Sequence, residues 1–190
     1  DNGIKALTLV KDLVDAGSMS KEVINWTQGD VMNQFISGNI AMMVNGPWQV
    51  PTMREQAPDL NWDVTLLPKD AEYASCLGGE NFGVIDGDNV DAALDFLQFA
   101  TSKDEVASYI DDFGYIAARK DVAEGQFTDD ETMQKFTEEM QYAQPRGPHA
   151  QWPEISDALS LAVNESITGT STPADAAAKA QSTIDGILAE

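Results

Sequence analysis

Apolar residues recur every three to four positions over most of the chain, the spacing that places them on one face of an α-helix. The first such segment covers residues 3–16 and stops at Gly17, a residue type that commonly ends helices. The same pattern predicts further helices over residues 30–38, 48–56, 90–101, 103–113, 128–143, 152–168 and 173–188. Helix therefore dominates the predicted structure.

Three short apolar runs interrupt the helical pattern. Residues 40–44 are continuously apolar between two turn signals, as in a strand buried on both faces. Residues 62–67 end at Pro68, and residues 81–85 follow Gly78 and Gly79. Three strands separated by helices predict an α/β layered architecture. Because three strands are few for so many helices, we expect polypeptide outside this sequence to add more sheet.

The start of the sequence suggests a piece of a longer polypeptide. Helical spacing begins almost at Asp1, with neither a methionine nor an N-cap cluster before it. No apolar run approaches the roughly 18–20 residues of a membrane span, and no basic region followed by an apolar segment opens the chain. We therefore expect any targeting signal to be absent or removed.

The charge balance excludes whole classes of partner. Asp and Glu number 32 against 11 Lys and Arg, which gives a formal net charge of −21. Nucleic-acid binding depends on Lys and Arg neutralising phosphates, and an anionic membrane surface repels an acidic protein. The sequence therefore predicts neither kind of partner.

Candidate catalytic and metal-binding groups are few. One cysteine, Cys76, and one histidine, His149, leave no intrachain disulfide and no Cys/His zinc site. No Gly-x-Ser-x-Gly elbow follows a predicted strand. Adjacent acid pairs at 111–112, 129–130 and 138–139 would suit glycoside hydrolysis, but they lie on predicted solvated helix faces. In the acidic run 86–91, Val90 stands where a calcium loop requires an oxygen ligand. We predict no catalytic residue, no cofactor and no metal ligand.

One turn is better placed for binding a ligand. Residues 45–48, Asn-Gly-Pro-Trp, join a predicted strand to a predicted helix, and ligands bind at this edge of α/β sheets. Trp48 could equally pack in the core. Between two other predicted strands, residues 78–81 offer close backbone approach together with the Glu80 carboxylate and the Asn81 amide.

A proline-rich loop is a second candidate ligand wall. Residues 144–153 contain three prolines, His149 and Trp152 between two predicted helices. A stiff loop that presents an aromatic side chain suits ligand contact, although Trp152 could also be a packing residue.

The order of these features resembles a known family, the carbohydrate-binding extracellular solute-binding proteins of ABC importers, typified by maltodextrin-binding protein. No single motif is decisive, but the match runs in order along nearly the whole chain. The motifs that carry it are Phe35-x-x-Gly38-x-x-Ala41-Met42, Asn45-Gly46-Pro47-Trp48, Leu66-Leu67-Pro68, Gly78-Gly79, Ala92-Ala93-x-x-Phe96-Leu97-x-Phe99-x-Thr101-Ser102, Gly114-Tyr115-x-x-x-Arg119 and Trp152-x-Glu154-Ile155-Ser156-x-Ala158.

The resemblance implies a helix-rich α/β fold of the type II periplasmic-binding-protein kind, of which this chain is the C-terminal portion. Residues 1–70 and 118–190 would form the C-terminal lobe, and residues 75–115 would complete the N-terminal lobe. The first half of the N-terminal lobe would belong to missing chain. The intact protein would be a monomer.

The resemblance also implies site residues. Trp48 matches the stacking tryptophan of the family, Glu80 and Asn81 lie next to the first hinge crossing, and Tyr115 and Arg119 flank the second. Family members often place another aromatic in the helix after Pro153, where this sequence has Ala158, Leu159 and Leu161. We therefore expect that stacking role to have moved to Trp152 or His149, or to have been lost.

The implied function is capture of a neutral mono- or oligosaccharide by hinge closure and its delivery to a membrane permease, without catalysis. The expected location is the outer face of the cytoplasmic membrane, as a surface lipoprotein, or the periplasm. Two alternatives stay open: the same family with a non-sugar solute, and a secreted glycan-active hydrolase.

Overall fold

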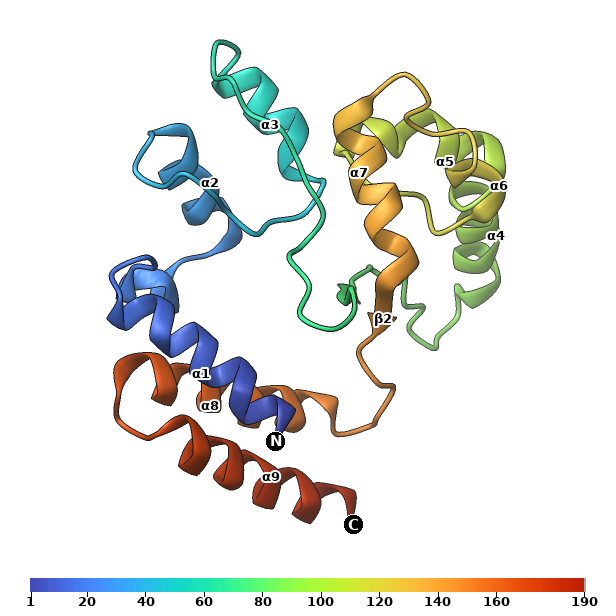
Figure 1. Cartoon of the computed structure of the whole chain (residues 1–190). Coiled ribbons are helices and arrows are strands. Elements are labelled where there is room, and N and C mark those ends of the chain that lie inside the picture. Colours follow the sequence, from blue (N-terminus) through green and yellow to red (C-terminus); the bar gives the residue numbers. More distant parts are fainter. Residues whose placement is uncertain (190) are drawn as a thin grey trace. The chain divides into compact units, whose positions relative to one another are not determined.

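The computed structural model describes residues 1–189, and these residues divide into two compact units (Figure 1). Residues 1–27 and 147–189 form one unit, and residues 28–146 form the other. Each unit is described below by itself.

The first unit is a small helical assembly built from both ends of the chain. Helices α1, α8 and α9 contact one another pairwise and lie side by side in Figure 1. Its elements are α1 (Asn2–Asp15), the 3₁₀ helix η1 (Lys21–Asn25), α8 (Trp152–Thr168) and α9 (Pro173–Leu188). The predicted bounds of α8 and α9 are confirmed, and α1 is displaced by one residue.

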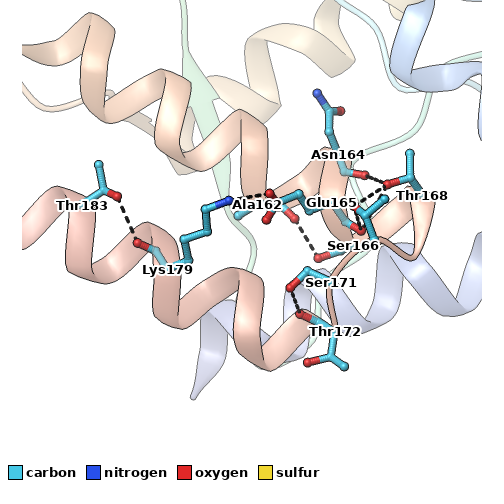
Figure 2. Close-up of polar contacts among 10 residues, drawn as sticks. Ala162, Asn164, Glu165, Ser166, Thr168, Ser171, Thr172, Lys179 and Thr183 are labelled. Carbon is cyan, nitrogen blue, oxygen red and sulfur yellow. Dashed lines mark hydrogen bonds and ion pairs between the residues drawn. The ribbon is translucent and has the colours of Figure 1, made fainter.

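Small side chains allow α8 and α9 to approach closely. Ala162 on α8 and Ala176 and Ala180 on α9 form a buried cluster, against which Leu7 of α1 packs. Figure 2 shows the polar contacts of this hairpin, including the Lys179 ammonium, which donates to the Glu165 carboxylate at 2.6 Å. The hairpin is thus held by an apolar seam with an ion pair beside it.

The N-terminus of α9 is capped by the side chain of Thr172. The Thr172 hydroxyl accepts a hydrogen bond from the backbone N–H of Asp175 at 3.1 Å and donates to the Asp175 carboxylate at 2.7 Å. Pro173 occupies the first turn, where its missing N–H costs no hydrogen bond. The chain before it ends α8 at Gly169, which has a left-handed φ of 76°.

We expect Thr172→Ala to lower the free energy of unfolding by about 1 kcal/mol, because the first turn of α9 loses its side-chain acceptor. The measurement is the urea midpoint of unfolding of the protein. Thr172→Ser keeps the hydroxyl and is the matched control. Equal stability of the alanine and serine variants would show that the cap contributes nothing.

The second unit holds the remaining helices and a small parallel sheet. Strand β1 (Ser75–Leu77) pairs with β2 (Ala143–Pro145), with Ser75 opposite Ala143. The helical elements are α2 (Gln28–Ile36), α3 (Gln49–Gln56), α4 (Val90–Ala100), α5 (Lys103–Tyr109), η2 (Asp111–Phe113), α6 (Lys120–Ala123), α7 (Glu131–Glu139) and η3 (Met140–Tyr142). Cys76 is exposed on β1.

The prediction of strands at 40–44, 62–67 and 81–85 is wrong for the part of the chain that the structure describes. A strand exists only where a neighbour completes its backbone hydrogen bonds, and none lies beside these segments there. Several of their apolar side chains are accordingly exposed to solvent, with Met42 86%, Val44 74% and Ile85 92% exposed. A local apolar run does not reveal whether a second strand will lie beside it, because that strand comes from a distant part of the sequence.

Two predicted helices are each divided into shorter elements. The helix predicted over 103–113 becomes α5 and η2, and the chain then turns at Gly114 with a φ of 66°. The helix predicted over 128–143 becomes α7, η3 and the strand β2. In both cases a tighter turn ends the α-helix before the apolar pattern ends.

The second unit has a defined apolar cluster and further buried side chains on its helices. Val106, Ala117 and Val122 form a cluster with Tyr109 and Ile110 packed against it. Met53 on α3 and Met133 on α7 are the largest apolar side chains that are fully buried, with 1% and 2% exposed. These methionines make α3 and α7 part of the interior of the unit.

An ion pair joins α3 to the start of α7. The Arg54 guanidinium donates to both oxygens of Asp130, at 2.7 and 2.9 Å. One of these oxygens also accepts from the backbone N–H of Met133, so that Asp130 caps α7. The hydrogen bonds from Arg54 hold the pKa of Asp130 below its ordinary value.

This lowered pKa gives a pH dependence with a definite sign. An aspartate whose pKa is depressed on folding stabilises the protein above its unfolded pKa of about 3.9, and the contribution is lost as the pH falls through the folded value. Because both side chains are partly exposed, the pair contributes up to about 1 kcal/mol. We expect Asp130→Asn to be less stable than the wild type at pH 6, with the difference narrowing below pH ~3.9. Urea midpoints of both proteins at pH 6 and at pH 3 measure this difference in stability.

Asp129→Asn is the matched control for this prediction. It removes the same charge from the neighbouring exposed residue without breaking the pair with Arg54. A difference between wild type and Asp130→Asn that stays constant from pH 6 to pH 3 would contradict the prediction.

Candidate functional site

Two aromatic side chains from distant parts of the sequence meet in the second unit. The ring centroids of Trp48 and Tyr115 are 5.9 Å apart with an angle of 35° between the ring planes. Trp48 immediately precedes α3, and Tyr115 follows the turn at Gly114. Both side chains are half-buried, and each combines an apolar ring with a polar group, the indole N–H or the phenol O–H. This pair is the structural centre of the candidate site.

The turn before Trp48 is tied down by Asn45. The Asn45 amide donates to the backbone carbonyl of Gln28 at 2.9 Å, and its oxygen accepts from the N–H of Gly46 at 3.0 Å. Both backbone and side-chain contacts therefore fix the position at which α3 begins. The sequence predicts ligand binding at this turn from its residue types. The structure shows which hydrogen bonds hold the turn in place.

The loop that carries Tyr115 is clamped by Gln126, which the sequence reasoning missed. The Gln126 amide donates to the Tyr115 carbonyl at 3.1 Å and to Asp111, while its oxygen accepts from the Ala117 N–H at 2.7 Å. The next residue, Phe127, adopts a φ of 56°, which is unusual for a residue other than glycine. No local motif signals this clamp, because its partners lie nine to fifteen residues away.

Arg119 is committed to contacts within its own unit. Its guanidinium donates to both oxygens of Asp121, at 3.0 and 2.9 Å, and to the Thr101 carbonyl at 3.2 Å. The hydrogen bonds from Arg119 hold the pKa of Asp121 below its ordinary value. The side chain thereby anchors the start of α6 to the end of α4, and its predicted contact with a ligand stays a prediction.

Glu80 and Asn81 lie in the irregular segment after β1, and both are exposed. Neither side chain takes part in a hydrogen bond or ion pair within residues 1–189. Their polar groups are thus available to an external partner, although the structure does not join them to the aromatic pair.

His149 and Trp152 belong to the first unit, at the beginning of α8. The His149 carbonyl accepts from the Trp152 N–H at 3.0 Å, and the imidazole Nδ1 accepts from the Gln151 N–H at 3.2 Å. Trp152 is half-buried as the first residue of the helix. These contacts form a turn that starts α8, and a role for either residue in ligand binding stays a prediction.

The described residues contain no group of three or more His, Cys, Asp or Glu side chains placed to hold a metal ion. Within the same residues, no helix has the length and apolar content needed to cross a membrane.

Comparison with known sequences places the chain beside bacterial binding proteins. The family model described as "Bacterial extracellular solute-binding protein" matches residues 1–138. Two proteins named as binding proteins, from Brucella abortus (strain 2308) and Brucella suis biovar 1 (strain 1330), are each 28% identical over 185 residues. The alignment covers 93% of this chain and 45% of each relative. The chain thus spans about half the length of these relatives.

Two solved structures are similar to this chain in fold. An ABC transporter solute-binding protein from Thermotoga lettingae TMO, bound with α-D-tagatose, is 28% identical with a TM-score of 0.82, over 98% of this chain and 49% of that one. The mannobiose-bound protein CpMnBP1 is 22% identical with a TM-score of 0.69, over 93% of this chain and 48% of that one, and shows likeness of fold alone. The predicted helix-rich, periplasmic-binding-protein-like fold is confirmed as a partial domain. The chain belongs to the bacterial extracellular solute-binding protein family.

Proposed function

We propose that the protein containing this chain is the solute-binding component of an ABC importer, which captures a neutral mono- or oligosaccharide and delivers it to a membrane permease. The observation that carries the proposal is the half-buried pair of Trp48 and Tyr115 at the start of α3. The flat, apolar face of an indole suits the C–H face of a pyranose ring, while polar groups near it read the hydroxyls.

Two further observations support a sugar over other solutes. The relative from Thermotoga lettingae, at 28% identity, holds tagatose. The chain carries 11 Lys and Arg against 32 Asp and Glu, a composition that disfavours binding of an anionic solute. A neutral ligand avoids repulsion by the acidic surface.

The mechanism that we propose is hinge closure. Sugar binds an open form, gains contacts to both lobes only when they close, and shifts the population toward a closed form that the permease recognises. In this proposal residues 1–70 and 118–190 belong to one lobe and residues 75–115 to the other. Glu80, Asn81 and Arg119 lie near the proposed crossings and would supply hydrogen bonds to the ligand.

The proposed mechanism contains no covalent step, and the protein is proposed to act without enzymatic turnover. The family is extracellular by description. We propose the periplasm or the outer face of the cytoplasmic membrane as its location, with a lipid anchor in the second case.

A thermal-shift scan of the native protein tests the proposal. The panel contains tagatose, mannobiose, α-glucosides, α-galactosides and β-xylosides, and a ligand that binds only the folded state raises the melting midpoint by mass action. A rise with one series, with the sugar recovered unchanged, supports the proposed function. A flat response across the panel would favour a non-sugar solute, and recovery of cleaved sugar would identify a hydrolase.

A further inference from the structure

The indole ring of Trp48 lies directly against the backbone of Gly46. A Cβ atom added to Gly46 would overlap three carbons of the six-membered ring of Trp48. Such an overlap lies far inside van der Waals contact, which begins for carbon atoms at about 3.5 Å. The space above the Gly46 α-carbon is therefore filled by the ring.

The backbone conformation of Gly46 does not itself require glycine. Among the described residues, the glycines with a left-handed φ are Gly17, Gly38, Gly114 and Gly169, and Gly46 is not one of them. An alanine at position 46 would be compatible with the backbone and incompatible with the ring. The requirement for glycine is thus a requirement for space beside Trp48.

The backbone at Gly46 is held by two hydrogen bonds. Asn45 accepts from the Gly46 N–H at 3.0 Å, and the Gly46 carbonyl accepts from the Gln49 N–H at 3.2 Å in the first turn before α3. A side chain at position 46 would have to break these contacts or move the indole. Rotation of an aromatic side chain about its own bonds is the smaller change.

A second glycine completes the surroundings of the ring. Gly114 has a φ of 66°, and a Cβ there would lie 2.8 Å from the Pro47 carbonyl oxygen and 2.9 Å from Cδ of Pro51. The absence of a side chain lets this turn approach the start of α3. The ring centroid of the next residue, Tyr115, consequently lies 5.9 Å from that of Trp48.

We propose that Gly46 is a positioning residue that sets the orientation of the Trp48 ring, with Tyr115 as the neighbouring wall. The inference rests on the proposed function, since the purpose of the fixed orientation is to present the indole to a sugar. A flexible indole would lose conformational freedom on stacking, whereas a ring that is already positioned avoids that cost. Substitution at position 46 therefore weakens stacking without touching the ligand.

The test uses the native protein labelled with 5-fluorotryptophan and observed by ¹⁹F NMR without ligand. The Trp48 resonance is the one that disappears in Trp48→Phe. We expect Gly46→Ala to move this resonance and leave the other tryptophan resonances in place. Gly87→Ala, where an added Cβ meets nothing within 4 Å, is the matched control and should move none of them. An unmoved Trp48 resonance in Gly46→Ala overturns the proposal.

Sugar affinity separates this inference from the function on which it rests. With a sugar that the wild type binds, Gly46→Ala should weaken affinity about tenfold, and Gly87→Ala should leave it unchanged. A moved resonance with unchanged affinity overturns the positioning role and keeps the proposed function. A wild type that binds no sugar of the panel overturns both, while the resonance still reports the ring contact.

A measurement on the wild type keeps the inference falsifiable if Gly46→Ala does not fold. The α-protons of Gly46, observed in protein labelled with ¹³C-glycine, should be shifted upfield by the Trp48 ring current. That shift should vanish in Trp48→Ala, which has no aromatic ring at this position. An unshifted Gly46 resonance in the wild type overturns the proposal without any substitution of the glycine.

Discussion

Replacing Trp48 by alanine is expected to weaken sugar binding by about 10- to 100-fold, which corresponds to about 1.4 to 2.7 kcal/mol. The indole is a half-buried aromatic surface beside Tyr115, and residues of this kind dominate the energetics of binding sites. Isothermal titration with a sugar identified in the thermal-shift scan measures the effect. The loss should lie mainly in the dissociation rate, because alanine removes contacts without changing long-range attraction.

Two further variants show whether this loss arises from stacking. Trp48→Phe keeps a smaller aromatic face and should lose less affinity than Trp48→Ala. Trp26→Phe changes a half-buried tryptophan of the first unit that lies outside the aromatic pair, and it should retain wild-type affinity. If phenylalanine and alanine at position 48 gave the same affinity as the wild type, the aromatic pair would not be the binding surface.

Replacing Met53 by alanine should produce the largest loss of stability. Met53 is 1% exposed, and truncation of a buried methionine removes apolar contacts and leaves a cavity. We expect the free energy of unfolding of the protein to fall by about 2 to 5 kcal/mol. Urea denaturation followed by circular dichroism measures the change.

The volume-conserving variant separates packing from other effects. Met53→Leu should lose less than about 1.5 kcal/mol, because it fills nearly the same space. Met42 is 86% exposed, so that Met42→Ala is a control that removes the same side chain from an open site. A stability loss at position 53 no greater than at position 42 would mean that the interior of the unit tolerates the cavity.

Helices were the most predictable part of the fold. The bounds of α8 and α9 follow from local signals, since Pro173, the Thr172 cap and the left-handed Gly169 all act within one or two turns. The strands were not predictable in the same way. β1 and β2 are three residues each and derive their stability from pairing across the chain, whereas longer apolar runs found no partner among residues 1–189.

In the candidate site, too, local features were predictable from the sequence and contacts between distant residues were not. Trp48 was identified from a local turn, and its predicted importance did not require knowledge of its neighbours. Its contact with Tyr115 depends on Gly114 approaching α3 and on Gln126 holding the loop, and these are contacts between distant residues. The sequence order of the family motifs indicated Tyr115, but only the structure shows the two rings together.

The parallel pairing of β1 with β2 has a consequence for how the second unit folds. The two strands lie on either side of α4, α5, α6 and α7 in the sequence, so that joining them closes a long loop. Contacts of high sequence separation are slow to form because the entropy of loop closure must be overcome first. By contrast, α8 and α9 are joined by a short turn and contact each other directly. We expect the α8–α9 hairpin to gain protection from hydrogen exchange early in refolding, and the β1–β2 pair to gain it last.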